Sequence, residues 1–487
     1  MLFNSYIFIF FFLPLCVAVY FLLYHLKMDK APRMWLFGMS LWFYGYFNPS
    51  YVCIICGSIL GNFLISRLLL REKARGRRRV GKVCMLFGVL ANVALLFYFK
   101  YFDFFLENIN AAFSMDFTMR NIVLPLGISF FTFQQISYVV DSYRGETEKY
   151  SLLDYAVFVA FFPQLVAGPI VLHGELISQL RDETKHRPNA ENLAKGLHFF
   201  AVGLFKKVII ADTLGNMVAL GFGGVEILTT VDVLLVIVAY ALQLYFDFSG
   251  YSDMASGIAS LFNIVLPVNF NSPYKARSIL EFWDRWHMTL TRFLRQYIYF
   301  PLGGSKKGRI RTYMNIMIVF VVSGFWHGAN WTFVVWGLLH GMAEVFTRRF
   351  RNTWGRLPAV LQWFLTFGFV SCAFLIFRAD SLHQVYIMFR KVAKLESLAV
   401  TETMLEALTL PEIAHLERLL HIDGLFEKNA LHLCIFLPLV LYMAVGTKNC
   451  QEKEFVCNVK TLAATVGMLV WTIVSLSGIS TFLYFNF

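Results

Sequence analysis

The chain has 487 residues, of which 58% are hydrophobic, 17% are aromatic and only 15% are charged. Charged residues make up about 25% of an ordinary soluble domain. The composition therefore excludes a soluble globule, a disordered chain, collagen and a coiled coil, and it predicts an integral membrane protein. Unbroken apolar runs as long as a helical span favour an all-α polytopic protein over a β-barrel, whose strands alternate over about ten residues.

The net charge of +12 comes from 43 Lys and Arg against 31 Asp and Glu. Basic residues gather in the cytoplasmic loops of membrane proteins and near anionic head groups, so the charge indicates a lipid bilayer and no nucleic acid. Cys53 and Cys56 form a C-x-x-C inside an apolar segment with no second pair. We interpret both as packing residues, and we expect neither a disulfide framework nor a metal site.

The predicted membrane segments number about 11 to 13 and extend over the whole chain, which we expect to form one integral membrane domain, 1–487. The first apolar run lacks a positive n-region and a cleavage site, so we interpret it as a retained helix. The segments are expected at 6–26, 34–48, 51–70, 83–106, 121–140, 196–222, 230–249, 252–268, 312–330, 331–347, 357–378, 431–446 and 460–485.

Two basic loops predict the orientation of the chain. Basic residues follow the first predicted span at Lys27, Lys30 and Arg33, and a denser group fills 71–82 after the third. Both loops fall on one side if the N-terminus is extracytoplasmic, and the positive-inside rule then assigns that side to the cytoplasm. The expected location is the cell (cytoplasmic, or inner) membrane. A cysteine placed at position 76 tests this orientation. If an impermeant reagent labels it readily in intact cells, the loop is extracytoplasmic and the orientation is the opposite one.

Three regions are not simple spans. The run 161–169 contains two prolines and is too short to cross, and 272–311 carries charged or histidine side chains among apolar ones, eight of them within 275–295. Irregular or charged backbone at membrane depth is tolerated only where it is buried in protein or lines a wet cavity, so both are candidate re-entrant walls of a site. The more polar stretch 380–430 contains an amphipathic piece, 411–420, which we expect at the surface.

Histidines surrounded by apolar residues are the first candidates for chemistry, because a polar group in a bilayer is costly. His327 is flanked by glycines, and a neutral imidazole accepts a proton from a hydroxyl near neutral pH. The alternative for His327 is a structural histidine bonded to a carbonyl. His287 has the same two interpretations, and His340 is better explained as a core residue.

Other polar residues carry weaker signals. Asp247 and Asp253 are six residues apart and do not share a helix face, so we expect each to cap or bridge irregular backbone around a kink at Gly250. The turn 303–308 has the wrong spacing for a phosphate loop. The chain has no G-x-S-x-G, H-E-x-x-H or P-loop signature.

Four blocks give the chain a resemblance to the membrane-bound O-acyltransferases, in the branch that acylates secreted polysaccharides. It is most similar there to the alginate O-acetylation membrane subunit, and more distantly to the teichoic-acid D-alanylation membrane subunit. The likeness runs to about residue 350. The blocks are FFPQLVAGPI at 161–170, YFDFSGYSDMA at 245–255, NFNSPYKARSILEFWDRWHMTLTRFLRQYIYFPLGG at 269–304 and SGFWHGANWTFVVWGLLHG at 323–341.

The resemblance implies a ring of tilted helices around a funnel with an inner tunnel, and a catalytic core at about 120–350. It assigns the two family histidines to His327 and His287. The other side chains of the histidine blocks expected to bind substrate are Trp326, Asn330, Trp286 and Asp284. At Asp284 many alginate-type relatives carry a basic residue.

The activity that the resemblance implies is acyl transfer across the membrane. An acyl thioester, acetyl-CoA in the first instance, approaches from the cytoplasm as a substrate, with no permanently bound cofactor. His327 is the general base or a transient acyl carrier, and His287 orients the thioester or the base. Four cations offer contacts to the phosphates of CoA, although plain positive-inside topology also explains them: Lys306, Lys307, Arg309 and Arg311.

The acceptor is expected outside the membrane. It is a hydroxyl of a polysaccharide, or of a separate extracytoplasmic protein, either an esterase-like acyltransferase of the SGNH type or a protein that presents the polymer. Leu416, Leu419 and Leu420 offer a docking surface for such a partner. D-alanyl transfer from an acyl-carrier protein to teichoic acid is the alternative within the family. A precursor transporter or flippase and a non-catalytic scaffold are alternatives of other classes.

Overall fold

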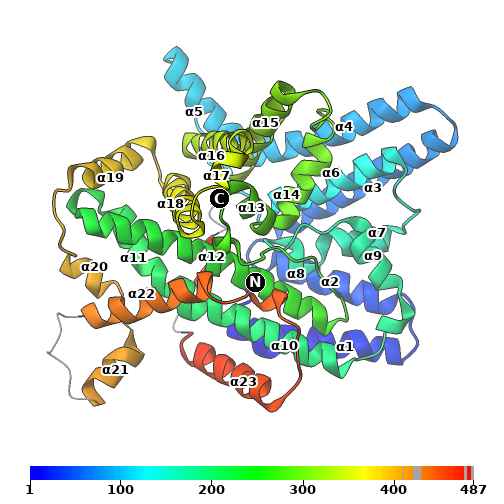
Figure 1. Cartoon of the computed structure of the whole chain (residues 1–487). Coiled ribbons are helices and arrows are strands. Elements are labelled where there is room, and N and C mark those ends of the chain that lie inside the picture. The colour runs from blue at the N-terminus through cyan, green and yellow to red at the C-terminus, as the bar shows by residue number, and fades with distance from the viewer. Residues whose placement is uncertain (409, 420–428, 477–479, 484–487) are drawn as a thin grey trace. The chain divides into compact units, whose positions relative to one another are not determined.

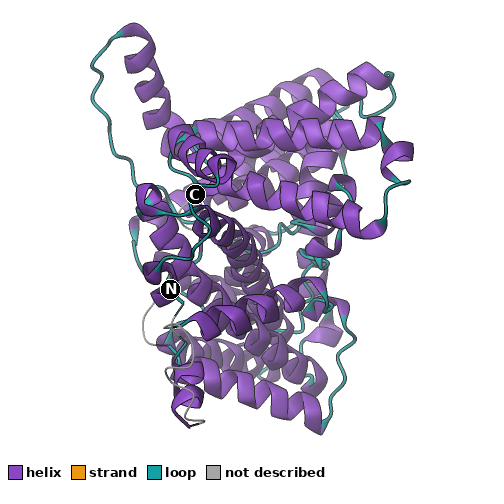
Figure 2. Cartoon of the chain, turned by 60° about the vertical axis from the view of Figure 1, so that its left-hand side comes forward, coloured by secondary structure: helices purple, strands orange, loops and turns teal. Residues whose placement is uncertain are grey.

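The structure is a computed structural model that describes residues 1–408, 410–419, 429–476 and 480–483 (Figure 1). Every regular element in these ranges is a helix (Figure 2). The chain forms two compact units. The first contains 1–204, 251–268 and 455–487, and the second contains 205–250 and 269–454. The single domain and the ring of helices stay predictions.

The first unit is built mainly from the N-terminal helices. Helix α1 packs on α2, α3 packs on α4 and α6, and α7 packs on α2, α3 and α9. Its helices are α1 (Leu13–His25), α2 (Ala31–Gly45), α3 (Ser50–Ala74), α4 (Arg78–Leu96), α5 (Phe102–Phe113), α6 (Ile128–Arg144), α7 (Leu152–Ala160), α8 (Phe162–Leu165), α9 (His173–Arg181), most of α10 (Ala190–Phe205) and α23 (Val459–Val474).

The second unit is organised around the pair α15 and α16, which pack along each other, with α13 and α18 packed against α16. Its helices are α11 (Asp212–Gly223), α13 (Ile279–Arg285), α14 (Met288–Leu294), α15 (Arg309–His327), α16 (Trp331–Arg349), α17 (Arg351–Trp354), α18 (Ala359–Arg378), α19 (Leu382–Lys394), α20 (Glu402–Glu406), α21 (Pro411–Leu419) and α22 (Ala430–Val445). Helix α12 (Thr230–Leu261) runs from this unit into the first.

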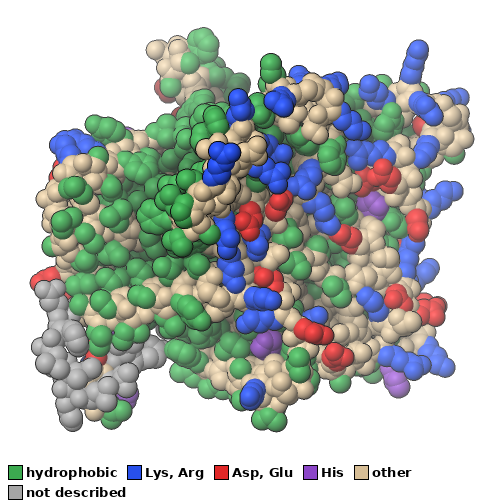
Figure 3. Space-filling model, viewed as in Figure 1, with side chains coloured by type: hydrophobic (Ala, Val, Ile, Leu, Met, Phe, Trp, Pro, Cys, Tyr) green, Lys and Arg blue, Asp and Glu red, His purple; other side chains and the backbone are tan. Residues whose placement is uncertain are grey.

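Six helical segments in the described ranges are long and apolar enough to cross a membrane, which makes the chain a multi-pass membrane protein. Other predicted spans fall on shorter helices, such as α2 with 15 residues, α6 with 17 and α23 with 16. The six are Phe8–His25, Ser50–Ala74, Arg78–Phe113, Thr230–Leu261, Ala359–Arg378 and Ala430–Glu452. Figure 3 shows broad areas of hydrophobic side chains on the face drawn, as a bilayer requires.

The predicted kink at Gly250 is wrong. Helix α12 continues without a break through Thr230–Leu261, so the two expected spans 230–249 and 252–268 are one helix followed by a loop. Asp247 does not cap a helix end but forms an ion pair of 2.7 Å with Lys207, which also lies 2.8 Å from Asp212. The buried lysine compensates the buried Asp247 carboxylate, and the helix needs no interruption there.

Both regions expected to be irregular are broken into short elements. Helix α8 has four residues, and the backbone N–H of Phe162 donates to Ser40 Oγ at 3.3 Å. The region 272–311 holds the seven-residue helices α13 and α14, joined at Trp286 and His287. In 380–430, Leu419 is 69% exposed, whereas the side chain of Leu416 and all of Leu420 lie outside the described residues.

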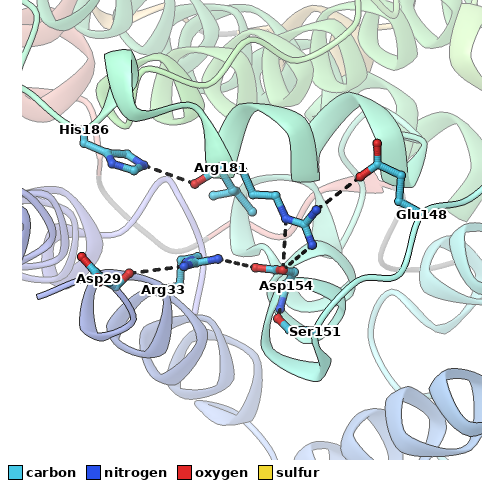
Figure 4. Close-up of polar contacts among 8 residues, drawn as sticks. Asp29, Arg33, Glu148, Ser151, Asp154, Arg181 and His186 are labelled. Atoms are coloured by element: carbon cyan, nitrogen blue, oxygen red, sulfur yellow. Dashed lines mark hydrogen bonds and ion pairs between the residues drawn. The ribbon is translucent and has the colours of Figure 1, made fainter.

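A buried carboxylate, Asp154, ties three helices of the first unit together (Figure 4). It accepts hydrogen bonds from Arg33 of α2 at 2.6 Å and from Arg181 of α9 at 2.8 Å, and Ser151 caps α7 at Asp154 N. Burial alone would raise the pKa of Asp154, but the hydrogen bonds from Arg181, Ser151 and Arg33 outweigh it and hold this pKa below its ordinary value.

We predict that Asp154→Asn lowers stability at neutral pH by about 2 kcal/mol, because two guanidinium groups lose their charged acceptor. A depressed pKa in the folded state contributes stability above the ordinary carboxyl pKa, and this contribution is lost as the pH falls through the folded value. The difference in thermal midpoint from the wild type should therefore shrink below about pH 4. Glu148→Gln, at an exposed partner of Arg181, is the control. An unchanged difference at low pH would contradict the assignment.

The close contact of α15 and α16 depends on glycine. A Cβ on Gly324 would collide with the carbonyl oxygen of Phe333, and a Cβ on Gly337 would collide with that of Phe320. The two backbones therefore approach with no side chain between them, as small residues permit in membrane proteins. The packing fixes the end of α15, where His327 lies.

We expect Gly337→Ala to destabilise the protein by about 1–3 kcal/mol, because the added methyl group must separate the two helices. Gly368→Ala in α18 is the matched control, since a Cβ there meets nothing within 4 Å. The control should be neutral or slightly stabilising, because alanine favours the helix. Thermal unfolding in detergent measures both variants. Equal stability of the two would refute the close contact.

Candidate active site

His327 is the last residue of α15 and is enclosed by aromatic rings from three helices of the second unit. Its side chain is 6% exposed. The ring centroid lies 4.9 Å from that of Trp326, 5.2 Å from Trp336 of α16 and 5.2 Å from Phe377 of α18. The polar imidazole is thus held in an apolar enclosure at the point where the helix ends.

His287 lies between α13 and α14 in a left-handed backbone conformation, with φ 44° and ψ 50°. Few residues other than glycine adopt this region, and such strain is concentrated at functional sites. The side chain is 1% exposed. The break between the two helices therefore places one buried histidine on a turn instead of on a helix face.

Asn269 determines which nitrogen of His287 carries the proton. Asn269 Oδ1 accepts from the backbone N–H of Thr289 at 3.3 Å and from its hydroxyl at 2.8 Å. A backbone N–H can only donate, so the atom facing it is the amide oxygen. His287 Nδ1, 3.1 Å from the same oxygen, must then donate. We assign the neutral tautomer in which Nε2 keeps its lone pair, which is the base-competent form.

The structure brings His287 and His327 to the same indole. Trp326 has its ring centroid 6.1 Å from that of His287 and 4.9 Å from that of His327. The two histidines come from segments 40 residues apart in sequence, and they converge because α13 and α15 both belong to the layer around α16. Both candidate bases therefore lie next to the same indole ring.

His340 takes a packing role. Its Nδ1 accepts from Trp283 Nε1 at 3.2 Å, and its ring is 4.9 Å from Trp336 and 5.4 Å from Phe369. It is fully buried. The hydrogen bond and the surrounding rings account for His340 as a core residue.

The other predicted site residues differ in their exposure and in their contacts. Trp286 is buried in an aromatic cluster and is 5.1 Å from Phe374, close to His287 in the chain. Asn330 caps α16 by accepting from Thr332 N, and its amide donates to the Asp380 carbonyl at 2.9 Å, so its polar atoms already have partners. The remaining three, Asp284, Lys306 and Lys307, are exposed.

Two neighbouring cavities lie on one side of the α15 and α16 pair. The first, of about 150 Å³, is lined by α13, α14, α15 and α16 and is mostly apolar at its inner end, with Trp283, Phe320 and Ser323. Asp284 lies in its wall and pairs with Arg295 at 3.2 Å. The second, of about 390 Å³, is lined by Arg309, Arg348 and Arg351, among others.

Sequence reasoning missed three residues of this region. Asn269 is followed two residues later by Asn271, so no local signal set it apart. Arg348 and Arg351 appear in sequence as ordinary basic residues at a helix end. Their place in a cavity depends on the return of α16 toward the beginning of α15, which no local pattern encodes.

The arrangement suits proton transfer in a water-poor enclosure. A buried imidazole next to an indole can accept a proton from a hydroxyl when it is neutral, and the surrounding rings offer no competing nucleophile.

Comparison with known proteins identifies the family. The MBOAT, or membrane-bound O-acyltransferase, family matches residues 85–379. The peptidoglycan O-acetyltransferase of Helicobacter pylori is 37% identical over 521 residues, covering 100% of this chain and 98% of that protein. The probable alginate O-acetylase AlgI of Pseudomonas aeruginosa is 38% identical over 396 residues, or 80% and 74% of the two chains. The teichoic acid D-alanyltransferase of Bacillus subtilis is 27% identical over 283 residues, or 54% and 71%. The chain therefore belongs to the membrane-bound O-acyltransferase family and is an O-acyltransferase.

Proposed function

We propose that this enzyme moves an acetyl group from a cytoplasmic thioester, acetyl-CoA, to a hydroxyl outside the membrane, in the O-acetylation of a cell-envelope polysaccharide. The observation that carries the proposal is that the buried rings of His327 and His287 both lie close to the ring of Trp326, at 4.9 and 6.1 Å between centroids, in a chain of this family. The O-acetylase names of two relatives support acetyl as the acyl group.

Peptidoglycan is the acceptor that the comparisons favour. The relative named for peptidoglycan aligns with 100% of this chain, whereas the alginate relative aligns with 80%. The C-terminal residues beyond the family match at 379 therefore have a counterpart in the first relative. D-alanyl transfer receives less support, because the teichoic acid enzyme aligns with only 54% of the chain at 27% identity.

In the proposed reaction, His327 takes the proton from the acceptor hydroxyl as its oxygen attacks the thioester carbonyl. The new C–O bond forms, the C–S bond breaks, and the proton leaves with the CoA thiolate. A thioester is already activated, so the protein needs mainly to align the two substrates and to remove one proton. A variant of this mechanism has His327 carry the acetyl group transiently before the hydroxyl accepts it.

His287 is proposed to orient the thioester or the base. Its Nδ1–H is held by Asn269, so the ring cannot rotate without losing that hydrogen bond. The buried aromatic setting of both histidines supports the exclusion of water, which would otherwise hydrolyse the thioester.

A separate extracytoplasmic protein is proposed to complete the reaction, because a long glycan must meet an acetyl group held at membrane depth. Such a partner presents the polymer, or accepts the acetyl group on its own nucleophile and passes it on. The exposed Leu419 on α21 is a proposed contact for it.

We predict that His327→Ala lowers acetyl transfer by about 10²–10⁴-fold, because the general base is lost. The protein should remain folded and inserted. His287→Ala should lose less, since an orienting role is partly redundant. His340→Gln is the matched control at another buried histidine that contacts Trp336, and it should affect stability more than turnover. Near-normal turnover of the purified His327→Ala variant would exclude the assignment.

The test of the whole proposal is the incorporation of labelled acetyl from acetyl-CoA into the polysaccharide of membrane vesicles. We expect transfer that requires both this protein and an extracytoplasmic partner. Deleting the partner should stop polymer acetylation while the purified protein still cleaves or exchanges the thioester slowly. Full cellular rates with this protein alone would show that no partner is needed. Absence of any thioester turnover would favour a transporter or a scaffold.

A further inference from the structure

The cavity of about 390 Å³ beside the first turn of α15 has the size of a small-molecule site and a strongly basic wall. Building on the proposed function, we propose that this cavity binds the phosphate groups of the donor, the 3′-phospho-ADP part of acetyl-CoA, through Arg309, Arg348 and Arg351.

The three arginines come from three elements. Arg309 opens α15, Arg348 lies in the last turn of α16, and Arg351 opens α17. No carboxylate lines the cavity. Arg309 and Arg351 form no ion pair within the described ranges, whereas Arg348 bonds Glu344 through two nitrogens at 2.9 and 3.0 Å. Guanidinium groups that share a cavity without a counter-ion repel one another, and an anion with several phosphates removes that repulsion.

The backbone at the start of α15 adds to the positive electrostatic potential of the cavity. Gly308, which precedes α15, has φ +86°, a conformation that side chains rarely adopt, and it lines the cavity together with Arg309. The first N–H groups of a helix have no partners inside the helix and carry a partial positive charge. The start of this 19-residue helix therefore supplies peptide donors next to the guanidinium groups.

Of the four cations that the sequence offered for the phosphates, Arg309 lines this cavity, whereas Lys306, Lys307 and Arg311 do not. Two arginines that sequence reasoning did not name, Arg348 of α16 and Arg351 of α17, line it together with Arg309. Arginine suits the role, because its planar fork binds two phosphate oxygens at once whereas lysine offers a point charge.

The smaller cavity lies next to the basic one. The two share Leu280 and Arg348 in their walls. The smaller cavity is lined further in by Phe320 and Ser323, and Ser323 lies one helical turn before His327. The lining of the smaller cavity is mostly apolar but also holds Asp284, Arg295, Glu344 and Arg348. Along α15 the order is the basic cavity at Arg309, then the smaller cavity at Phe320 and Ser323, and then His327, which lines neither cavity. This order matches a donor with an anionic head, an uncharged arm and a terminal thioester.

An anionic lipid head group offers the same phosphate chemistry, so the experiment must separate the two sources. Purified full-length enzyme is assayed with acetyl-CoA and with S-acetyl-pantetheine, which has the arm and the thioester but no phosphate. Arg309→Gln, Arg351→Gln and the double variant are compared with Arg356→Gln, an exposed arginine outside the cavity.

We expect each cavity variant to raise the KM for acetyl-CoA about tenfold, as the loss of a charge-assisted contact predicts, with little change in kcat. The KM for S-acetyl-pantetheine and both parameters of Arg356→Gln should stay unchanged. Equilibrium binding of adenosine 3′,5′-bisphosphate should weaken in parallel, which is measured without turnover.

Equal effects on the two donors, or none on acetyl-CoA, would overturn the inference. The thermal stabilisation of the protein by phosphatidylglycerol is measured for the same variants. If the variants change only this stabilisation, the cavity is a lipid site and the inference is also overturned. If neither thioester supports transfer, the proposed function fails. Arginine-dependent binding of the bisphosphate would in that case still locate the phosphate site, so the two failures are distinguishable.

Discussion

The direct contact between α15 and α16 is the constraint on which the candidate site depends. Gly324 and Gly337 let the two backbones touch, and any larger residue would push them apart. His327 ends α15, and Trp336 lies on α16 next to Gly337. The distance of 5.2 Å between these two rings is therefore set by a backbone contact and not by flexible side chains. A site that must hold a proton acceptor to within a fraction of an ångström gains from such support.

The same packing determines the electrostatic surroundings of the chemistry. Aromatic rings exclude water from both histidines, and a low local dielectric strengthens each polar contact that forms there. His287 needs a fixed partner in such a setting, and Asn269 supplies one. The strained turn at His287 is the local cost of bringing the ring to Trp326 and Asn269 together. The same contacts thus both position the two histidines and enclose them.

The irregular segments around the candidate site were predictable from the sequence because their signals are local. Glycines on both sides of His327 and the two proline-broken or charged regions all indicated irregular packing around polar groups, and the structure has broken helices there. The kink at Gly250 was predicted wrongly for the opposite reason. Glycine and aspartate suggested a break, but Lys207, 40 residues earlier, neutralises Asp247 and keeps the helix whole. Pairing across the fold overrides local propensity.

Contacts between distant segments explain what sequence reasoning missed. Asn269 becomes informative only when His287 and Thr289 fold back onto it. Arg348 and Arg351 face Arg309 only because α16 runs back along α15. The number of spans stays a prediction, because six helical segments of the described ranges are long and apolar enough to cross a bilayer. Other apolar segments that hydropathy marks form shorter helices, such as α2 and α23.

The length of α15 restricts which donors fit the two cavities. Thr312 lines the basic cavity and Ser323 lines the inner one, and eleven residues of helix place them about 16 Å apart along the axis. His327 lies about 6 Å farther on. A compact activated acetyl compound, such as an acyl phosphate, cannot contact the arginines and His327 at the same time. A donor with a long arm between its phosphates and its thioester can do so. The separation of charge from base along one helix is therefore what the proposed pantetheine thioester requires, with its phosphates near one end of α15 and its acetyl group near the other.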